Sequence, residues 1–126
     1  MAGPPDPLAD ALRAQLEAAA EGFDWHEEAQ LWDKLAEEIE ELRGAGSAAT
    51  RTEELGDLLF MAVNLARHLR VDPLAALRQA NAKFRRRFAY VMQHAEGLPP
   101  VGHPQRLDAM EALWSEAKQR EKPPGA

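Results

Sequence analysis

The segment LWDKLAEEIEEL, residues 31–42, combines an apolar stripe with a dense run of acids. Its apolar residues recur every three or four positions, as on one face of an α-helix: Leu31, Leu35, Ile39 and Leu42. Two later segments, residues 55–69 and 77–91, show the same period. Alternation with a period of two is absent, and β-branched residues are few. The sequence therefore predicts an all-α fold.

Helix boundaries follow from capping residues and prolines. Asp6-Pro7 and Asp72-Pro73 each place a capping acid before a proline that suits the first helical turn. Capping-box spacing recurs in two further pairs, Asp24 with Glu27 and Thr50 with Glu53. We expect helices at about residues 7–21, 25–43, 51–70, 73–95 and 104–121. Their short connections favour an antiparallel bundle of four to five helices.

The size of the chain bounds its organisation. With 126 residues, we expect a single domain over residues 1–126, with frayed Pro- and Gly-rich ends at residues 1–5 and 122–126. One such chain buries only a modest core. We therefore expect a second copy to complete the bundle, as a homodimer or larger homo-oligomer.

Charge and residue usage exclude several classes of protein. The net charge of −6 argues against nucleic acid as the main partner, because phosphate backbones require clustered Lys and Arg. The absence of cysteine excludes disulfides and zinc–thiolate sites. No apolar run reaches the length of a membrane span, and the first ten residues lack a signal-peptide pattern. We expect a cytoplasmic protein with no membrane partner.

Two acidic clusters border the apolar stripes of neighbouring helices. At about 100° per residue, Glu38 lies beside the stripe of residues 31–42, and Glu41 and Glu37 follow along the same border. The next helix places two acids beside its own leucines. If the two helices pack antiparallel, four carboxylates could face one another: Glu38, Glu41, Glu54 and Asp57.

This concentration of negative charge has two interpretations. A run of acids is usually a solvated helix face. Partial burial of like charges on two adjacent helices is costly, however, unless a divalent cation offsets it. No histidine follows a Glu by three residues, as a carboxylate-bridged di-iron bundle would need. The oxygen ligands favour Mg²⁺, with Mn²⁺ as a substitute.

Polar and aromatic residues of the last two helices could contact a phosphorylated ligand. Lys83 and Arg87 are four residues apart beside an aromatic stripe, and they could clamp phosphate oxygens or pair with the acidic helices. Asn64 and Asn81 could each hydrogen-bond a base or sugar, or a buried carbonyl. The neighbours of Trp114 favour core packing over base stacking.

The ordered set of motifs resembles a known family. Glu37-Glu38-Ile39-Glu40-Glu41, followed by Glu54-Leu55-Gly56-Asp57, resembles the E-E-x-x-E, spacer and E-x-x-D pattern of the MazG nucleotide pyrophosphohydrolases. Gly22-Phe23-Asp24-Trp25 and the segments 63–69 and 80–88 are also similar to that family. The resemblance covers residues 22–120.

The resemblance implies an α-helical, oligomeric enzyme that binds Mg²⁺. It assigns the role of metal ligand to four residues: Glu38, Glu41, Glu54 and Asp57. It assigns substrate contacts to Lys83, Arg87 and Trp114, and an outer role to Glu37. Asn81 joins these predicted substrate residues because of its own position near an apolar face. Longer family members contain two such domains, and we expect one here.

The resemblance also implies the reaction. We expect Mg²⁺-dependent hydrolysis of ribo- and deoxynucleoside triphosphates to monophosphate and pyrophosphate, with a house-cleaning role in the nucleotide pool. Water would attack the α-phosphorus, and Glu38 or Glu41 would accept its proton; the residues leave open which of them does. Two alternatives remain: an enzyme restricted to dUTP or another single nucleotide, and a non-catalytic helical module whose acidic face binds a basic partner.

Overall fold

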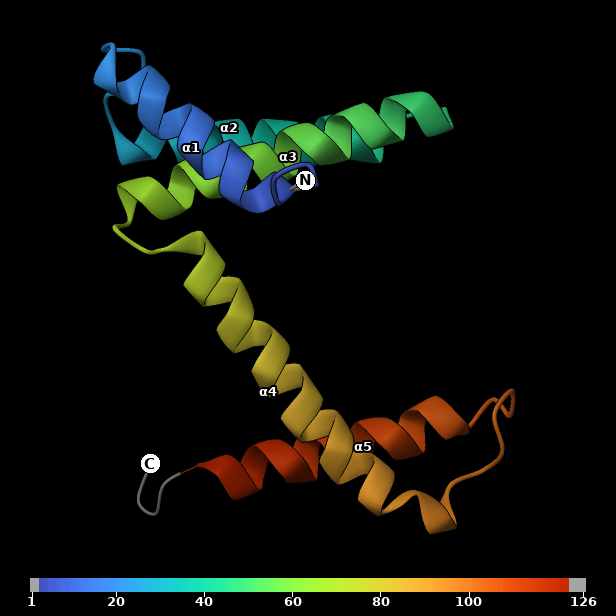
Figure 1. Ribbon diagram of the computed structural model, residues 1–126. Coiled ribbons are helices and arrows are strands. Elements are labelled where there is room, and N and C mark those ends of the chain that lie inside the picture. Colours follow the sequence, from blue (N-terminus) through green and yellow to red (C-terminus); the bar gives the residue numbers. More distant parts are fainter. Residues whose placement is uncertain (1–2, 123–126) are drawn as a thin grey trace. The chain divides into compact units, whose positions relative to one another are not determined.

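The computed structural model describes residues 3–122, which form five α-helices and one short 3₁₀ helix (Figure 1). The elements are α1 (Pro7–Ala20), α2 (Glu28–Arg43), α3 (Ala48–His68), α4 (Pro73–Gln93), η1 (Ala95–Gly97) and α5 (Arg106–Glu121). No strand occurs in this range, so the all-α prediction is confirmed for it. The predicted fraying of residues 1–2 and 123–126 lies outside the described residues.

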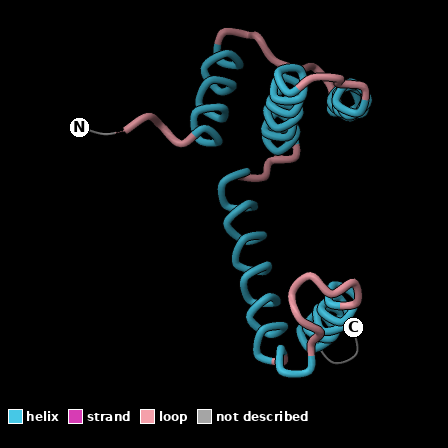
Figure 2. The backbone as a smooth tube through the Cα atoms, turned by 90° about the vertical axis from the view of Figure 1, so that its right-hand side faces the viewer, coloured by secondary structure: helices cyan, strands magenta, loops and turns pink. Residues whose placement is uncertain are grey.

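The chain divides into two compact units, Met1–Ala76 and Leu77–Ala126. In the first unit, α1, α2 and α3 lie side by side (Figure 2). The connection between α2 and α3 covers only residues 44–47, so these two helices run antiparallel along their contact. That arrangement confirms the antiparallel packing on which the acidic site was predicted. The prediction of a single domain stays a prediction.

The core of the first unit is small. Leu31 of α2 and Val63 of α3 are fully buried, and Met61 is nearly so. Other large apolar side chains of the same stripes remain open, and Leu59 is 60% exposed. The stripes seen in the sequence are therefore covered only in part.

Two predicted helix starts are confirmed by their hydrogen bonds. Asp6 and Asp72 each accept hydrogen bonds from two backbone amides of the helix that follows, α1 and α4 respectively. Both helices carry proline at the next position, where a missing amide proton costs nothing. Among the described residues, every helix is too short or too polar to span a bilayer.

Two other predicted starts are wrong. The Asp24–Glu27 box does not form; α2 begins three residues later than expected, behind a box made by Glu27 and Gln30. The helix α3 begins three residues earlier than expected, because the Ser47 hydroxyl accepts the Thr50 amide at 3.1 Å and extends the helix toward α2. In both cases a competing cap lies within one turn of the predicted one.

In the second unit, α4 and α5 contact each other through long side chains. The Phe84 and Trp114 ring centroids are 5.4 Å apart. The Tyr90 hydroxyl donates to Glu116 Oε1 at 2.6 Å. The predicted ends shift slightly here as well, since α4 ends at Gln93 rather than residue 95 and α5 begins at residue 106 rather than 104.

Candidate active site

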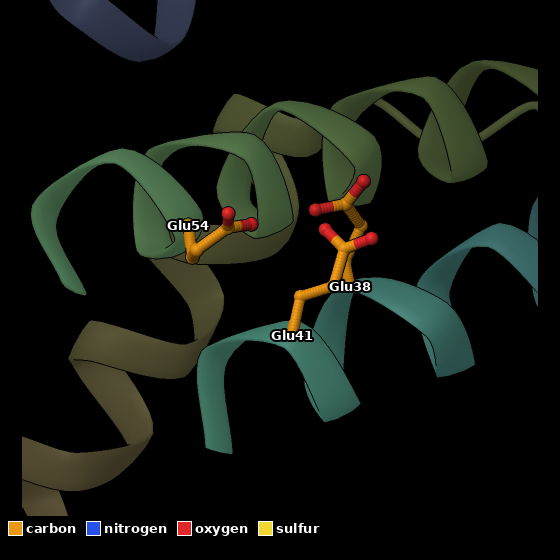
Figure 3. A group of neighbouring side chains, drawn as sticks. All are labelled: Glu38, Glu41 and Glu54. Carbon is orange, nitrogen blue, oxygen red and sulfur yellow. The ribbon is translucent and has the colours of Figure 1, made fainter. Parts of the chain in front are cut away.

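Three of the predicted carboxylates converge between α2 and α3 (Figure 3). One oxygen from each of Glu38, Glu41 and Glu54 lies within 4.8 Å of the others. Glu38 and Glu41 stand about one turn apart on α2, and Glu54 reaches them from the antiparallel α3. Because the burial of Leu31 directs this side of α2 toward α3, Glu38 is only 5% exposed. The predicted convergence is confirmed for these three residues.

The other two acids of the motif lie outside this group. Asp57 is exposed on α3 and does not belong to the set of oxygens within 4.8 Å. Glu37 is exposed on α2, and its Oε1 lies 3.4 Å from the ammonium group of Lys34. The role of Asp57 as a fourth ligand and the outer role of Glu37 stay predictions.

The electrostatics of the group reflect crowded negative charge. The carboxyl group of Glu54, which lies beside Glu41, is the main cause that raises the pKa of Glu41. Partial desolvation and the charges of Glu38, Glu54 and Glu37 raise it further. Moreover, Glu38 Oε2 and Glu54 Oε2 are buried and have no hydrogen-bond partner within the part of the chain that the structure describes. A buried carboxylate oxygen without a donor is costly, so positive charge is missing at these two oxygens.

A divalent cation fits this deficiency. All the available donors are carboxylate oxygens, which suit Mg²⁺ and Mn²⁺. The buried, unpartnered oxygens of Glu38 and Glu54 come from opposite helices, so one ion could serve both. The group could therefore hold a divalent cation.

Sequence reasoning missed the contribution of Lys34. Its ammonium group lies 3.3 Å from Glu38 Oε1, one turn along α2. This contact offsets the charge on one oxygen of Glu38 and leaves Oε2 without a partner. The spacing of four residues was the available signal, because side chains at that spacing meet on a helix.

A second polar network, also missed, holds the segment that leads into α2. The Arg67 guanidinium of α3 donates to both Asp24 oxygens, at 2.9 and 3.1 Å. It also donates to Gln15 Oε1 at 3.0 Å and to Asn64 Oδ1 at 2.7 Å. These bonds tie α1 and the α1–α2 connection to α3. The Asn64 amide is buried and engaged here, which favours the structural interpretation for that residue.

The same network shifts the ionisation of Asp24. The hydrogen bond from Arg67 holds the pKa of the Asp24 carboxyl well below its usual range, with smaller contributions from His68 and the Trp25 amide. Burial acts in the opposite direction and is outweighed. Asp24 is thus a charged anchor rather than a helix cap.

Except for Glu37, the predicted substrate residues lie in the second unit. Arg87 is half-buried, and its guanidinium lies 5.8 Å from the centre of the Trp114 ring. Asn81 and Lys83 are exposed on α4. Trp114 also contacts Phe84, as expected for a packed aromatic. The approach of these residues to the acidic group stays a prediction.

Comparison with known proteins places this geometry in a family. Residues 6–84 match the family described as phosphoribosyl-ATP pyrophosphohydrolase, and this range contains the whole acidic group. The chain belongs to the MazG-like nucleoside triphosphate pyrophosphohydrolase family. The predicted recognition is therefore confirmed.

Individual members of the MazG-like family resemble most of the chain. It is 39% identical over 111 residues to the nucleoside triphosphate pyrophosphohydrolase/pyrophosphatase MazG of Thermotoga maritima, covering 88% of this chain and 44% of that protein. It is 40% identical over 121 residues to the nucleoside triphosphate pyrophosphohydrolase of Escherichia coli K12, covering 90% of this chain and 45% of that protein. The chain thus spans less than half the length of these relatives.

Proposed function

We propose that this chain hydrolyses ribo- or deoxynucleoside triphosphates to a monophosphate and pyrophosphate, in a reaction that depends on Mg²⁺. The observation that carries the proposal is the convergence of Glu38, Glu41 and Glu54, with two buried oxygens that lack partners. It is supported by relatives that are named nucleoside triphosphate pyrophosphohydrolases. A house-cleaning role in the cytoplasm, which the resemblance implies, belongs to the same proposal.

The acidic group supplies the metal ligands in this proposal. Glu38, Glu41 and Glu54 would hold Mg²⁺, with Asp57 as the fourth ligand. A bound Mg²⁺ would make a water molecule more acidic and offset the charge of the triphosphate. Mn²⁺ has the same preference for oxygen ligands and would substitute for it.

The remaining residues bind substrate and move a proton. Water attacks the α-phosphorus, the bond from that phosphorus to the α–β bridging oxygen breaks, and pyrophosphate leaves. Glu38 or Glu41 accepts the proton of the water. Lys83 and Arg87 bind phosphate oxygens, and Arg offers a planar pair of donors for this purpose. Asn81 and Trp114 would contact the nucleoside, and Glu37 would support the ligands from outside.

We further infer that the functional form is a homodimer or larger homo-oligomer. The support is the number of large apolar side chains that the first unit leaves open on α2 and α3, including Trp32, Leu55 and Leu59. Such patches are typical of an interface. Sedimentation of the full chain tests this inference, and a stable monomer at micromolar concentration would contradict it.

A pyrophosphate-release screen tests the proposed reaction. All common ribo- and deoxynucleoside triphosphates are offered with Mg²⁺, with Mn²⁺ and with chelator. Glu38→Gln should abolish release. The matched control is Glu40→Gln, because Glu40 lies on the same helix and, among residues 3–122, pairs only with Arg43, at 3.8 Å. Release that survives Glu38→Gln, or that needs no divalent cation, would exclude the site.

The same screen separates the alternatives. Phosphoribosyl-ATP is included because the matching family carries its name. Turnover of that compound or of dUTP alone would indicate a single-substrate enzyme with the same acidic group. The absence of pyrophosphate release from every nucleotide, with each metal, would favour a non-catalytic acidic module.

A further inference from the structure

The last residue of α5 binds two adjacent arginines of α4. Glu121 Oε1 lies 3.0 Å from Arg86 Nε, and Glu121 Oε2 lies 3.0 Å from Arg87 Nε. The two arginines lower the pKa of the Glu121 carboxyl, Arg86 more than Arg87. The carboxylate is therefore charged at neutral pH, and each of its oxygens serves one guanidinium.

The position of this acid is unfavourable for the helix itself. Glu121 ends α5, where the helix dipole places negative charge and favours cations. The preceding turn already carries Lys118 and Arg120, which suit that end. A glutamate at this position is consequently stabilised by its contacts with α4 rather than by its own helix.

The two arginines are held differently. Arg86 is largely solvated, with 58% of its side chain exposed, whereas Arg87 is 17% exposed. Arg87 is enclosed by Glu121 and by Trp114, whose ring centre lies 5.8 Å from the guanidinium carbon. Only its Nε donates to Glu121. Within residues 3–122, its terminal nitrogens donate to no other residue, so the outer edge of the fork stays free.

We propose that Glu121 is a positioning residue, which holds the Arg87 guanidinium so that its two terminal nitrogens are presented to a phosphate group. The inference rests on the proposed function, in which Arg87 binds phosphate. An arginine fixed in advance loses less side-chain entropy when it binds an anion. The geometry suits this division, since the Nε edge binds the carboxylate and the opposite edge remains for the substrate.

A competing effect has the opposite sign. Glu121 is itself negative, so it weakens the attraction of Arg87 for phosphate. Glu121 is about one-quarter exposed, at 27%, so nearby water raises the effective dielectric constant and weakens this repulsion. The entropy cost of ordering a mobile Arg87 side chain is not reduced by water in this way. Positioning should therefore outweigh neutralisation, and removal of the carboxylate should weaken phosphate binding.

The experiment measures inorganic pyrophosphate binding by calorimetry in the presence of Mg²⁺, using the full chain. Glu121→Gln removes the charge and one of the two acceptors. We expect about three- to tenfold weaker binding, the range for one side chain that must be newly ordered. The matched control is Glu116→Gln, which removes one charge from the same helix at a residue bound to Tyr90 and not to Arg87. It should leave the affinity unchanged.

A double-mutant cycle separates positioning from general effects on the fold. In an Arg87→Ala background, Glu121→Gln should have no further effect on pyrophosphate affinity, because its target is gone. Arg86→Ala leaves the Glu121–Arg87 contact in place and should change affinity less than twofold. Tighter binding by Glu121→Gln, an equal loss in the Arg87→Ala background, or no binding by the wild type would overturn the proposal.

The same variants distinguish this inference from the proposed reaction. A wild-type chain that releases no pyrophosphate from any nucleotide, yet loses pyrophosphate affinity on Glu121→Gln, contradicts the reaction and supports the positioning role. A chain that hydrolyses nucleotides equally well with and without Glu121 contradicts the positioning role alone. Thermal melts of each variant identify any loss of affinity that comes from unfolding.

Discussion

Replacement of Glu54 by glutamine is the most direct test of the acidic group. The substitution keeps the shape of the side chain and removes one of three converging negative charges. The new amide would donate to its carboxylate neighbours, and the buried oxygen without a partner would be lost. In chelator, therefore, the variant should be more stable than the wild type, although most substitutions of half-buried residues destabilise.

The size of the effect follows from the spacing of the group. Two unit charges 4.8 Å apart repel by about 0.9 kcal/mol in water and about 3.5 kcal/mol at an effective dielectric constant of 20. Glu54 is half-buried, so a gain of about 1–2 kcal/mol is expected between these limits. For a chain of 126 residues, this corresponds to a Tm increase of about 4–8 °C.

The assay is thermal unfolding at pH 8, in chelator and in Mg²⁺. Mg²⁺ at ten times its Kd should stabilise the wild type by about 1.4 kcal/mol, and Glu54→Gln should lose most of that gain. Glu40→Gln, at an exposed acid of α2, should show neither effect. A Glu54→Gln variant that is less stable in chelator, or that responds to Mg²⁺ like the wild type, would refute the electrostatic argument.

Three further predictions concern the frame around this group. Asp24→Asn breaks the paired contact with Arg67 and should lower the free energy of unfolding, measured in urea, by about 1–3 kcal/mol. Because the pKa of Asp24 is lowered in the folded state, this loss should be full at neutral pH and should shrink as the pH falls below about 4. A loss that does not depend on pH would contradict the assignment. Leu31→Ala removes a buried side chain of α2 and should lower the free energy of unfolding by about 2–5 kcal/mol. The control is Ile39→Ala, at a half-exposed position, which should lower it less. If Asp57 is a metal ligand, Asp57→Asn should lower kcat/KM by more than about 100-fold and raise the Mg²⁺ concentration for half-maximal activity, whereas an unchanged metal requirement would exclude it.

Residues close together in the chain were enough to predict the helical fold. The period of Leu31, Leu35 and Ile39, with the Asp-Pro starts at residues 6 and 72, predicts helices without any long-range information. The two wrong starts come from competition between caps that lie close together in the chain. Asp24 is a residue type that often caps helices. Only its contact with Arg67, 43 residues away, shows that it anchors the α1–α2 connection to α3 instead.

The acidic group was predictable for the same local reason. Glu38 and Glu41 share one border of a helix because of their spacing, and Glu54 lies beside its own stripe, so antiparallel packing was enough to bring the three together. The position of Asp57 was not predictable in this way. A helical wheel gives the direction of a side chain to within a wide sector, while membership of the group depends on a few ångströms.

The sequence alone was enough to predict the helical class, the family resemblance and the choice of acids. Each of these depends on residues close together in the chain. Only the tertiary structure decided which carboxylates meet, which of their oxygens lack a partner, and which distant side chains hold Asp24 and Arg87. Those outcomes depend on burial and on contacts between helices, where a hydrogen bond is made or lost within one ångström.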